Sequence, residues 1–262
     1  RHLKDIDALG GTPGHQGLEA PGRILAQGLG HMSRQLHRAI RLNLCRGPWK
    51  DQRRPILINN WEATLFDFDA EKICSIAKAA SQVGVEMMVM DDGWLGKRND
   101  DFAGLGDWNV NQAHPDWAFQ VPGRPMTRGR SQLVLDLTRA EVRQYIMDNL
   151  RATLNSAPIS YVKWDMNRSL TDVWSAALPA QRQGEVYHRY VLGVYEILEM
   201  LHQEFPQVLI EGCSGGGGRF DCGMLYYTPQ IWCSDNTDAI ERLRIQYGTS
   251  FCYPCAAVGA HV

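Results

Sequence analysis

The sequence predicts an α/β fold in which parallel β-strands alternate with α-helices. The first observation is a repeated change of period, from short apolar runs typical of strands to apolar residues at every third or fourth position, typical of helices. The second is that polar residues follow the apolar runs, at the carboxyl ends where (β/α) barrels and open α/β sheets both place their sites. These polar clusters are Asn59 with Asn60 and Glu62, Asp91 with Asp92, Lys163 with Asp165, Glu211 with Cys213, and Asp235 with Asp238.

Length and composition narrow the classes of protein that fit. The chain has 262 residues, and an α/β barrel takes ~250 residues. A net charge of −2 provides no basic surface for nucleic acid, and no apolar run approaches the ~20 residues of a membrane span. We therefore expect no nucleic-acid partner and no membrane partner.

The seven cysteines form an odd set at irregular spacing, which is not a disulfide framework. We expect reduced thiols in a cytoplasmic protein. Cys252 and Cys255 have C-x-x-C spacing, but no second such pair and no histidine at zinc-ligand spacing accompanies them. For these two residues buried thiols are expected, with a metal or redox role as the alternative.

Six apolar runs predict barrel-type strands, several of them buried, and 133–137 is a shorter strand-like piece. The six runs are 54–61, 85–90, 159–165, 208–211, 230–233 and 256–262. Five segments have helical periodicity, with Asp69 as an N-cap of the second and Thr138 with Glu141 as a capping box for the third. The five segments are 24–44, 70–83, 139–155, 184–205 and 238–250. Residues 1–23 and 95–131 are expected to be irregular.

Lys163, Asp165 and Asn167 share one side of the strand that ends at Asp165, because side chains alternate along a strand. A neighbouring lysine suits a carboxylate that acts as a nucleophile better than one that donates a proton. The alternative is a structural pair of Asp165 with Lys163 at a strand end. The hexapeptide alone slightly favours that alternative.

Asp235 follows Trp232 and Cys233 and has no adjacent cation. Apolar surroundings suit a carboxyl group that serves as general acid and base. The alternative is that Asp235 caps the following helix, a common use of a Ser-Asp-Asn-Thr run. The residues support both interpretations equally.

Asp91, Asp92 and Trp94 form an acidic pair with an indole nearby, a combination that fits the hydroxyl groups and the apolar face of a hexose. A magnesium site and a solvated turn are the alternatives. The glycine-rich run 211–218 lacks both the P-loop ending and the dinucleotide spacing, so phosphate binding is disfavoured. We expect its glycines to let the backbone approach a ligand.

With these groups described, the sequence resembles the bacterial α-galactosidases of glycoside hydrolase family 36. Seven motifs carry the resemblance, and the match runs from about residue 18 to the end. The motifs are Asn60-Trp61-Glu62-Ala63-Thr64, Met90-Asp91-Asp92-Gly93-Trp94, Gly106-Asp107-Trp108, His114-Pro115-Asp116-Trp117, Lys163-Trp164-Asp165-Met166-Asn167-Arg168, Cys213-Ser214-Gly215-Gly216-Gly217 and Ser234-Asp235-Asn236-Thr237-Asp238.

The resemblance implies that Asp165 is the nucleophile and Asp235 the general acid and base of a retaining glycosidase. It further implies that Asp91 and Asp92 hold the 4- and 6-hydroxyl groups of galactose. The other residues expected to line the pocket are Trp61, Arg130, Lys163, Cys213, Gly215 and Trp232. Asn167, on the same strand face as Asp165, is predicted to contact the substrate as well. No metal and no cofactor are expected.

The chain also departs from the family pattern. Only five residues separate Trp108 from His114, where the family has a strand, a helix and a pocket tryptophan. The family's N-terminal β-sandwich, its last barrel strand and its C-terminal β domain are not matched either. The expected fold is therefore an α/β (β/α)8 TIM-type barrel that is incomplete, with the third and last strands missing. Residues 1–53 would form a linker and docking helix, and 54–262 the partial barrel.

The resulting hypothesis is a cytoplasmic retaining α-galactosidase acting on terminal α-galactosides of the melibiose or raffinose type, assembled as a homo-oligomer. Loss of a barrel strand could displace the catalytic groups, so a catalytically impaired sugar-binding remnant is one alternative. A related α-galactosyl transferase, which would differ in its acceptor site, is the other.

Overall fold

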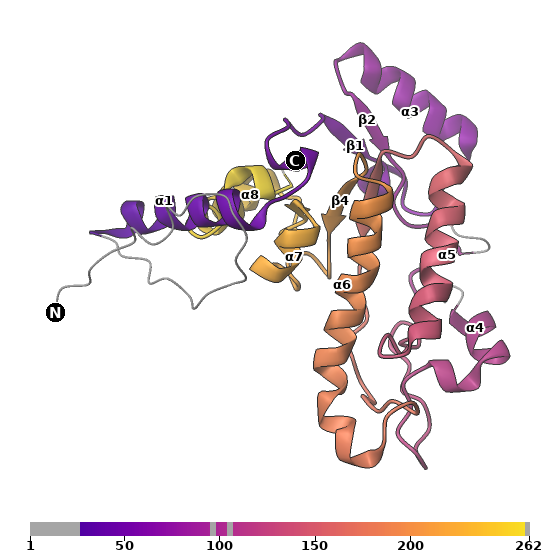
Figure 1. Cartoon of the computed structure of the whole chain (residues 1–262). Helices are drawn as coiled ribbons and strands as arrows, with labels where there is room; N and C mark the ends of the chain where they lie inside the picture. The colour runs from indigo at the N-terminus through magenta and orange to yellow at the C-terminus, as the bar shows by residue number, and fades with distance from the viewer. Residues whose placement is uncertain (1–26, 95–97, 104–106, 260–262) are drawn as a thin grey trace. The chain divides into compact units, whose positions relative to one another are not determined.

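The computed structural model describes residues 27–94, 98–103 and 107–259 (Figure 1). The predictions for 1–23, for the first residues of the helix 24–44 and for 260–262 therefore lie outside the described residues. The chain divides into two units, one from Arg53 to Val208 and one that joins the residues up to Gln52 with those from Leu209 onward.

The 53–208 unit begins with a βαβ arrangement. β1 (Leu57–Asn59) pairs in parallel with β2 (Met87–Val89), with Ile58 opposite Met88, and α2 (Trp61–Thr64) and α3 (Ala70–Gln82) lie between them in the chain. The Asp69 carboxylate accepts a hydrogen bond from the Lys72 amide, so the predicted N-cap of α3 is confirmed.

The rest of this unit is mainly helical, with α4 (Asp107–Ala113), α5 (Ala140–Ser156), β3 (Tyr161–Trp164) and α6 (Val186–Glu204), and with short 3-10 helices at Pro115–Trp117 and Ala180–Glu185. α5 and α6 lie side by side (Figure 1), joined by the Arg143–Glu196 and Arg151–Glu204 ion pairs. Phe119, Val134 and Val186 form a buried cluster beside them. The predicted helix at 184–205 is confirmed, and Val194, Leu198 and Leu201 on it are buried.

The second unit contains the remaining strands. β4 (Leu209–Gly212) pairs in parallel with β5 (Gln230–Ile231), and Ile231 forms a parallel bridge to Val258. The helices here are α1 (Leu29–Ala39) with a π-turn at Ile40–Leu44, α7 (Cys222–Tyr227) and α8 (Ala239–Thr249), with 3-10 turns at Pro48–Lys50 and Cys255–Ala257. His37 Nε2 lies 2.7 Å from the Ser250 carbonyl oxygen and donates to it, which attaches α1 to the end of α8.

All observed strand pairings are parallel, and strands alternate with helices as predicted for an α/β fold. In the described part of 90–160 no strand occurs beyond isolated bridges such as Ala118 with Leu135. The strand-like piece at 133–137 is therefore only a bridge, and α4 lies within a stretch expected to be irregular.

Four local predictions are wrong. β1 and β3 are half-buried rather than buried, whereas β4 is fully buried. Thr138 does not cap α5, because its amide and hydroxyl both donate to Asp136. Glu141 does not complete the capping box, because its carboxylate instead accepts a hydrogen bond from the Arg139 side chain. Cys252 and Cys255 are exposed rather than buried, because they lie in a surface turn between α8 and the bridge at Val258.

In the described residues, no helix combines the length and the apolar character that crossing a membrane requires.

Candidate active site

Asp91 lies two residues after β2, and its carboxylate is held by side chains from two other segments and by a neighbouring amide. Its Oδ2 accepts hydrogen bonds from Asn59 Nδ2 at 2.6 Å and from Lys163 Nζ at 2.7 Å, and its Oδ1 accepts from the Asp92 amide. Burial alone would raise the pKa of Asp91, but the charge and hydrogen bond of Lys163, with the Asn59 bond, lower it below the ordinary value. Asp91 is therefore a fixed, ionised acceptor at the strand ends.

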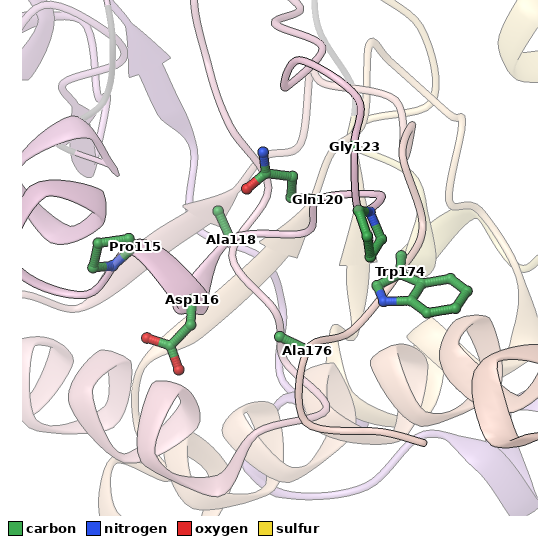
Figure 2. A pocket seen from close by; sticks show the side chains of 8 residues that line it. Pro115, Asp116, Ala118, Gln120, Gly123, Trp174 and Ala176 are labelled. Atoms are coloured by element: carbon green, nitrogen blue, oxygen red, sulfur yellow. The ribbon is translucent and has the colours of Figure 1, made fainter. Parts of the chain in front are cut away.

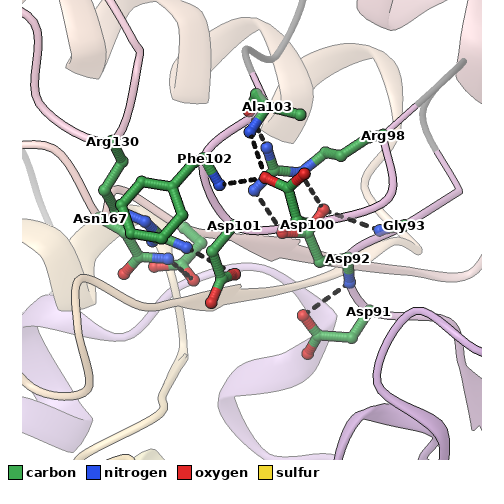
Figure 3. A network of polar contacts seen from close by, with 11 residues as sticks. Asp91, Asp92, Gly93, Arg98, Asp100, Asp101, Phe102, Ala103, Arg130 and Asn167 are labelled. Carbon is green, nitrogen blue, oxygen red and sulfur yellow. Dashed lines mark hydrogen bonds and ion pairs between the residues drawn. The ribbon is translucent and has the colours of Figure 1, made fainter.

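Asp92 is held differently, by an arginine from the following turn (Figure 3). Arg98 donates from Nε to Oδ1 at 2.5 Å and from Nη2 to Oδ2 at 2.7 Å. Gly93 adds an amide donor at 2.7 Å. The φ of Gly93 is +91°, and a Cβ added there would lie 3.1 Å from the rings of Phe66 and Phe68, which explains why a glycine follows the acidic pair.

These two ion pairs bear on the magnesium alternative. Lys163 neutralises Asp91 and Arg98 neutralises Asp92, and a cation beside each carboxylate disfavours a divalent metal there. In the described residues, no group of three or more His, Cys, Asp or Glu side chains is arranged to hold a metal ion.

Asp165 directly follows β3 and is exposed. Its Oδ1 accepts from the Met166 amide at 2.7 Å and its Oδ2 from Asn167 Nδ2 at 2.8 Å. The predicted placement of Asp165 and Asn167 on one side is consistent with this contact. Two amide donors orient the carboxylate while leaving it open to solvent, as an attacking group requires.

Trp61 and Arg130 belong to the same unit. The Trp61 amide donates to Asn59 Oδ1, and its ring meets Phe66 edge to face at 5.0 Å. Arg130 lies in a turn at a φ of +50° and donates to Asp101 at 2.8 Å. The structure thus joins Trp61 to Asp91 through Asn59, and Arg130 to the turn that also carries Arg98.

Arg168, the last residue of the Lys163–Arg168 motif, is buried and supports the turn that carries Arg130. It donates to the carbonyl oxygens of Gln132 and Thr127 at 3.2 Å and 2.6 Å. A Cβ added at Gly129 would lie 2.8 Å from its Cδ, so only a glycine fits there.

Asp235 lies in the other unit and is exposed. Its Oδ1 accepts from the Trp232 indole N–H at 2.8 Å. The N-cap of α8 is Asp238, whose carboxylate accepts from the amides of Ile240 and Glu241. The interpretation of Asp235 as the helix cap is therefore wrong, because the cap is three residues later and the helix begins at Ala239.

The glycine-rich run packs against the segment that carries Asp235. A Cβ at Gly216, which has a φ of +77°, would lie 2.8 Å from Ser234 Cα, and one at Gly217 would lie 2.7 Å from the Cys233 carbonyl oxygen. These two glycines therefore permit a close approach of backbone to backbone. Gly215 also has a positive φ, of 51°. Cys213 is buried, and its carbonyl accepts from Arg219 at 2.7 Å.

Arg242, buried in α8, holds the other side of the Asp235 segment. It donates to the carbonyl oxygens of Ser234 at 3.0 Å and Gly259 at 3.1 Å, and its guanidinium lies 5.5 Å from the centre of the Trp232 ring. Sequence reasoning missed Arg242, Arg98 and Asp101. Each of these three residues contacts its partner in the folded chain, and no local sequence pattern indicates that partner. By contrast, the sequence did single out Asn59, in a polar cluster after a strand, and Arg168, in a family motif.

Figure 2 shows an open hollow of about 430 Å³ in the 53–208 unit. It is lined by Pro115, Asp116, Ala118, Gln120, Pro122, Gly123, Trp174 and Ala176. None of the predicted site residues lines it.

Polar side chains thus follow the parallel strands, Asp91 and Asp92 are held as acceptors, and the Trp232 indole donates to Asp235. The sequence profile of the Melibiase family matches residues 19–113 and 111–262. The chain belongs to this family.

Two curated relatives illustrate the similarity. The chain is 50% identical to α-galactosidase AgaA of Geobacillus stearothermophilus over 274 residues, which cover 90% of this chain and 38% of that protein. It is 48% identical to the bifunctional α-galactosidase/sucrose kinase AgaSK of Mediterraneibacter gnavus, covering 90% of this chain and 29% of the relative. The chain thus spans well under half the length of the curated relatives it matches.

Solved structures agree. A variant of the GH36 α-galactosidase AgaA from Geobacillus stearothermophilus, in complex with raffinose, superposes with a TM-score of 0.87 at 48% identity, covering 90% of this chain and 38% of that one. The α-galactosidase from Lactobacillus brevis gives a TM-score of 0.87 at 42% identity, covering 91% and 37%.

Proposed function

We propose that this chain is the catalytic portion of a retaining α-galactosidase that hydrolyses terminal α-galactosyl residues of melibiose- or raffinose-type sugars. The observation that carries the proposal is the network around Lys163, which links Asp91 after β2 to the strand that ends at Asp165. Half of the aligned residues are identical to an α-galactosidase.

The proposed mechanism is a double displacement. Asp165 attacks the anomeric carbon, and the bond from that carbon to the leaving oxygen breaks as Asp235 donates a proton to it. Asp235 then takes a proton from water, the water oxygen bonds to the anomeric carbon, and Asp165 departs. Asp91, Asp92, Trp61, Arg130, Lys163, Asn167, Cys213, Gly215 and Trp232 hold the sugar.

The proposal includes an incomplete (β/α)8 barrel that lacks its third strand. In support, the family match is in two parts that meet at residues 111–113. The alignment of 274 positions is longer than this 262-residue chain, so the relative has residues that this chain lacks. Residues 54–262 form the partial barrel in this proposal, and 1–53 the linker and docking helix.

A cytoplasmic location and self-association complete the proposal. Seven cysteines in an irregular pattern support a reducing compartment. Ile240, Leu243 and Tyr247, spaced along one face of α8, are all exposed, which supports a homo-oligomeric contact. Light scattering on the parent and on Leu243→Glu tests that contact, since a monomeric parent would contradict it.

A second candidate is a sugar-binding remnant without turnover, which the interruption at residues 111–113 favours. The test is nitrophenol release from a nitrophenyl α-galactoside, with galactose binding measured by calorimetry on the same preparation. Release supports the hydrolase. Binding without release supports the remnant, and a folded protein that does neither contradicts both.

A further inference from the structure

The turn of residues 98–103 follows the acidic pair and contacts two separate predicted sugar-binding side chains. Arg98 contributes a bidentate pair to Asp92, the geometry that best fixes the plane of a carboxylate. The Arg98 side chain is only 2% exposed, whereas Asp92 is 22% exposed. The guanidinium therefore lies beneath the carboxylate, and Asp92 retains an accessible side.

The same turn holds Arg130, which comes from a different part of the chain. Asp101 Oδ1 accepts from Arg130 Nη2 at 2.8 Å (Figure 3). Asp101 and Arg130 are both partly exposed, at 48% and 30% of their side chains, so this pair lies nearer the surface than the pair of Arg98 with Asp92.

Hydrogen bonds within residues 98–103 fix the conformation of this turn. Asp100 Oδ1 accepts from the amides of Phe102 at 2.7 Å and Ala103 at 2.9 Å, and Arg98 Nη1 donates to the Ala103 carbonyl. Arg98 and Asp101 are thus anchored in one short closed segment.

We propose that the 98–103 turn is a positioning element for substrate, in which Arg98 orients Asp92 and Asp101 orients Arg130 toward the same sugar. This inference rests on the proposed function, because it assigns Asp92 and Arg130 to galactose binding. Arg98 and Asp101 touch the binding side chains and act through them.

A purely structural ion pair is the competing explanation, and the two differ in what a conservative change does. Arg98→Lys keeps the positive charge but cannot make the bidentate contact. If the pair only stabilises the fold, Arg98→Lys changes the melting temperature and leaves galactose affinity alone. If the pair orients Asp92, affinity falls in protein that remains folded.

The experiment measures galactose binding by calorimetry, with KM and kcat for a nitrophenyl α-galactoside, on the parent, Arg98→Lys, Arg98→Met and Asp101→Asn. Loss of one well-oriented hydrogen bond predicts that Arg98→Lys raises the galactose Kd and the KM about 10-fold, with a smaller change in kcat. Arg98→Met should bind more weakly still, and Asp101→Asn should weaken binding about 3-fold, because its pair is more exposed.

Arg53→Met is the matched control. It removes a bidentate arginine–carboxylate pair, with Glu86, that is exposed and joins none of the predicted site residues. Its Kd should equal that of the parent. If folded Arg98→Lys binds galactose with the same Kd as the parent, the positioning role is overturned and the proposed function is left intact. A parent that neither binds galactose nor hydrolyses the substrate would overturn both.

Discussion

The two proposed catalytic carboxylates have different kinds of support. Around Asp165 side-chain contacts predominate, with Lys163 bound to Asp91 and with Asn167 bound to Asp165 beside the Met166 amide. Around Asp235 one side chain, the Trp232 indole, holds the carboxylate, and the main chain is positioned by Arg242 on carbonyl oxygens and by glycines that admit close backbone approach. The comparison teaches that the first region depends on charge pairing and the second on backbone packing, so substitutions should affect them in different ways.

Asp165→Asn should cause the largest effect on activity. Loss of the nucleophile predicts a fall in turnover on the order of 10⁴-fold or more, because the covalent route is removed. Asp165 is exposed, so the melting temperature should change little. Nitrophenol release and circular dichroism measure the two effects. Activity near that of the parent would refute the assignment.

Asp235→Asn should reduce activity by an amount that depends on the leaving group. A general acid contributes roughly 10²- to 10⁴-fold, and its loss matters most for raffinose, whose leaving oxygen needs a proton. The measurement is kcat/KM for raffinose and for the nitrophenyl substrate. The raffinose value should fall further.

Asp238→Asn is the matched control, since Asp238 caps α8 three residues away. Because asparagine is about as good an N-cap as aspartate, the change should alter stability little and lower both substrates' rates equally, if at all. A drop of the same size for both substrates in Asp235→Asn would argue against a general acid.

Arg242→Met should destabilise the Asp235 region. The part-buried carbonyl oxygen of Ser234 and the buried one of Gly259 lose their charged donor, which predicts a loss of ~2 kcal/mol in the free energy of unfolding. Urea unfolding measures it. Arg244→Met on the same helix, with an exposed side chain, should change it by less than ~0.5 kcal/mol. Equal values for the two variants would show that Arg242 does not hold this region.

Acid should weaken the Asp165 region through Asp91. A carboxylate whose pKa falls on folding contributes stability that is present above its unfolded pKa and lost as the pH drops through the folded value. The pKa of Asp91 is lowered from 3.8, so stability should fall as the pH decreases below that value. Asp91→Asn should flatten this dependence, measured as urea stability against pH.

Glu86 provides a comparison on the surface. The hydrogen bond from Arg53, then that from the Ile56 amide, lowers its pKa to about 2. Because that pair is exposed, salt should screen its contribution more than that of the half-buried Asp91–Lys163 pair. The measurement is the loss of stability caused by Asp91→Asn and by Glu86→Gln at low and at high salt. If salt reduces the two losses equally, this distinction is contradicted.

The sequence predicted the elements whose signals are local. α3 with its Asp69 cap, α6, and the strands before Asp91 and Asp165 follow from periodicity and capping within one segment. The sequence did not separate Asp235 from Asp238 as the cap of α8, because both lie in one polar run. It also missed α7, because a helix of six residues is too short to show a helical repeat of apolar positions.

The supports of the site were the part least accessible to sequence reasoning. Arg98 and Asp92 are close in sequence, but many arginines follow acidic residues without pairing. Arg130 with Asp101, and Arg242 with Gly259, depend on the folded path of the chain. Charge pairing of this kind is tertiary, so motifs located the carboxylates but not the groups that hold them.

The central claim is that Asp165 forms the covalent bond to galactose. An α-galactosyl fluoride carrying a second fluorine on its ring should react through loss of fluoride and leave a slowly hydrolysed galactosyl ester on the nucleophile. Mass spectrometry of the digested protein should find the added sugar on the peptide that contains Asp165, and none on Asp165→Asn. A label on any other residue, or turnover with no label in the trapping experiment, would contradict the account.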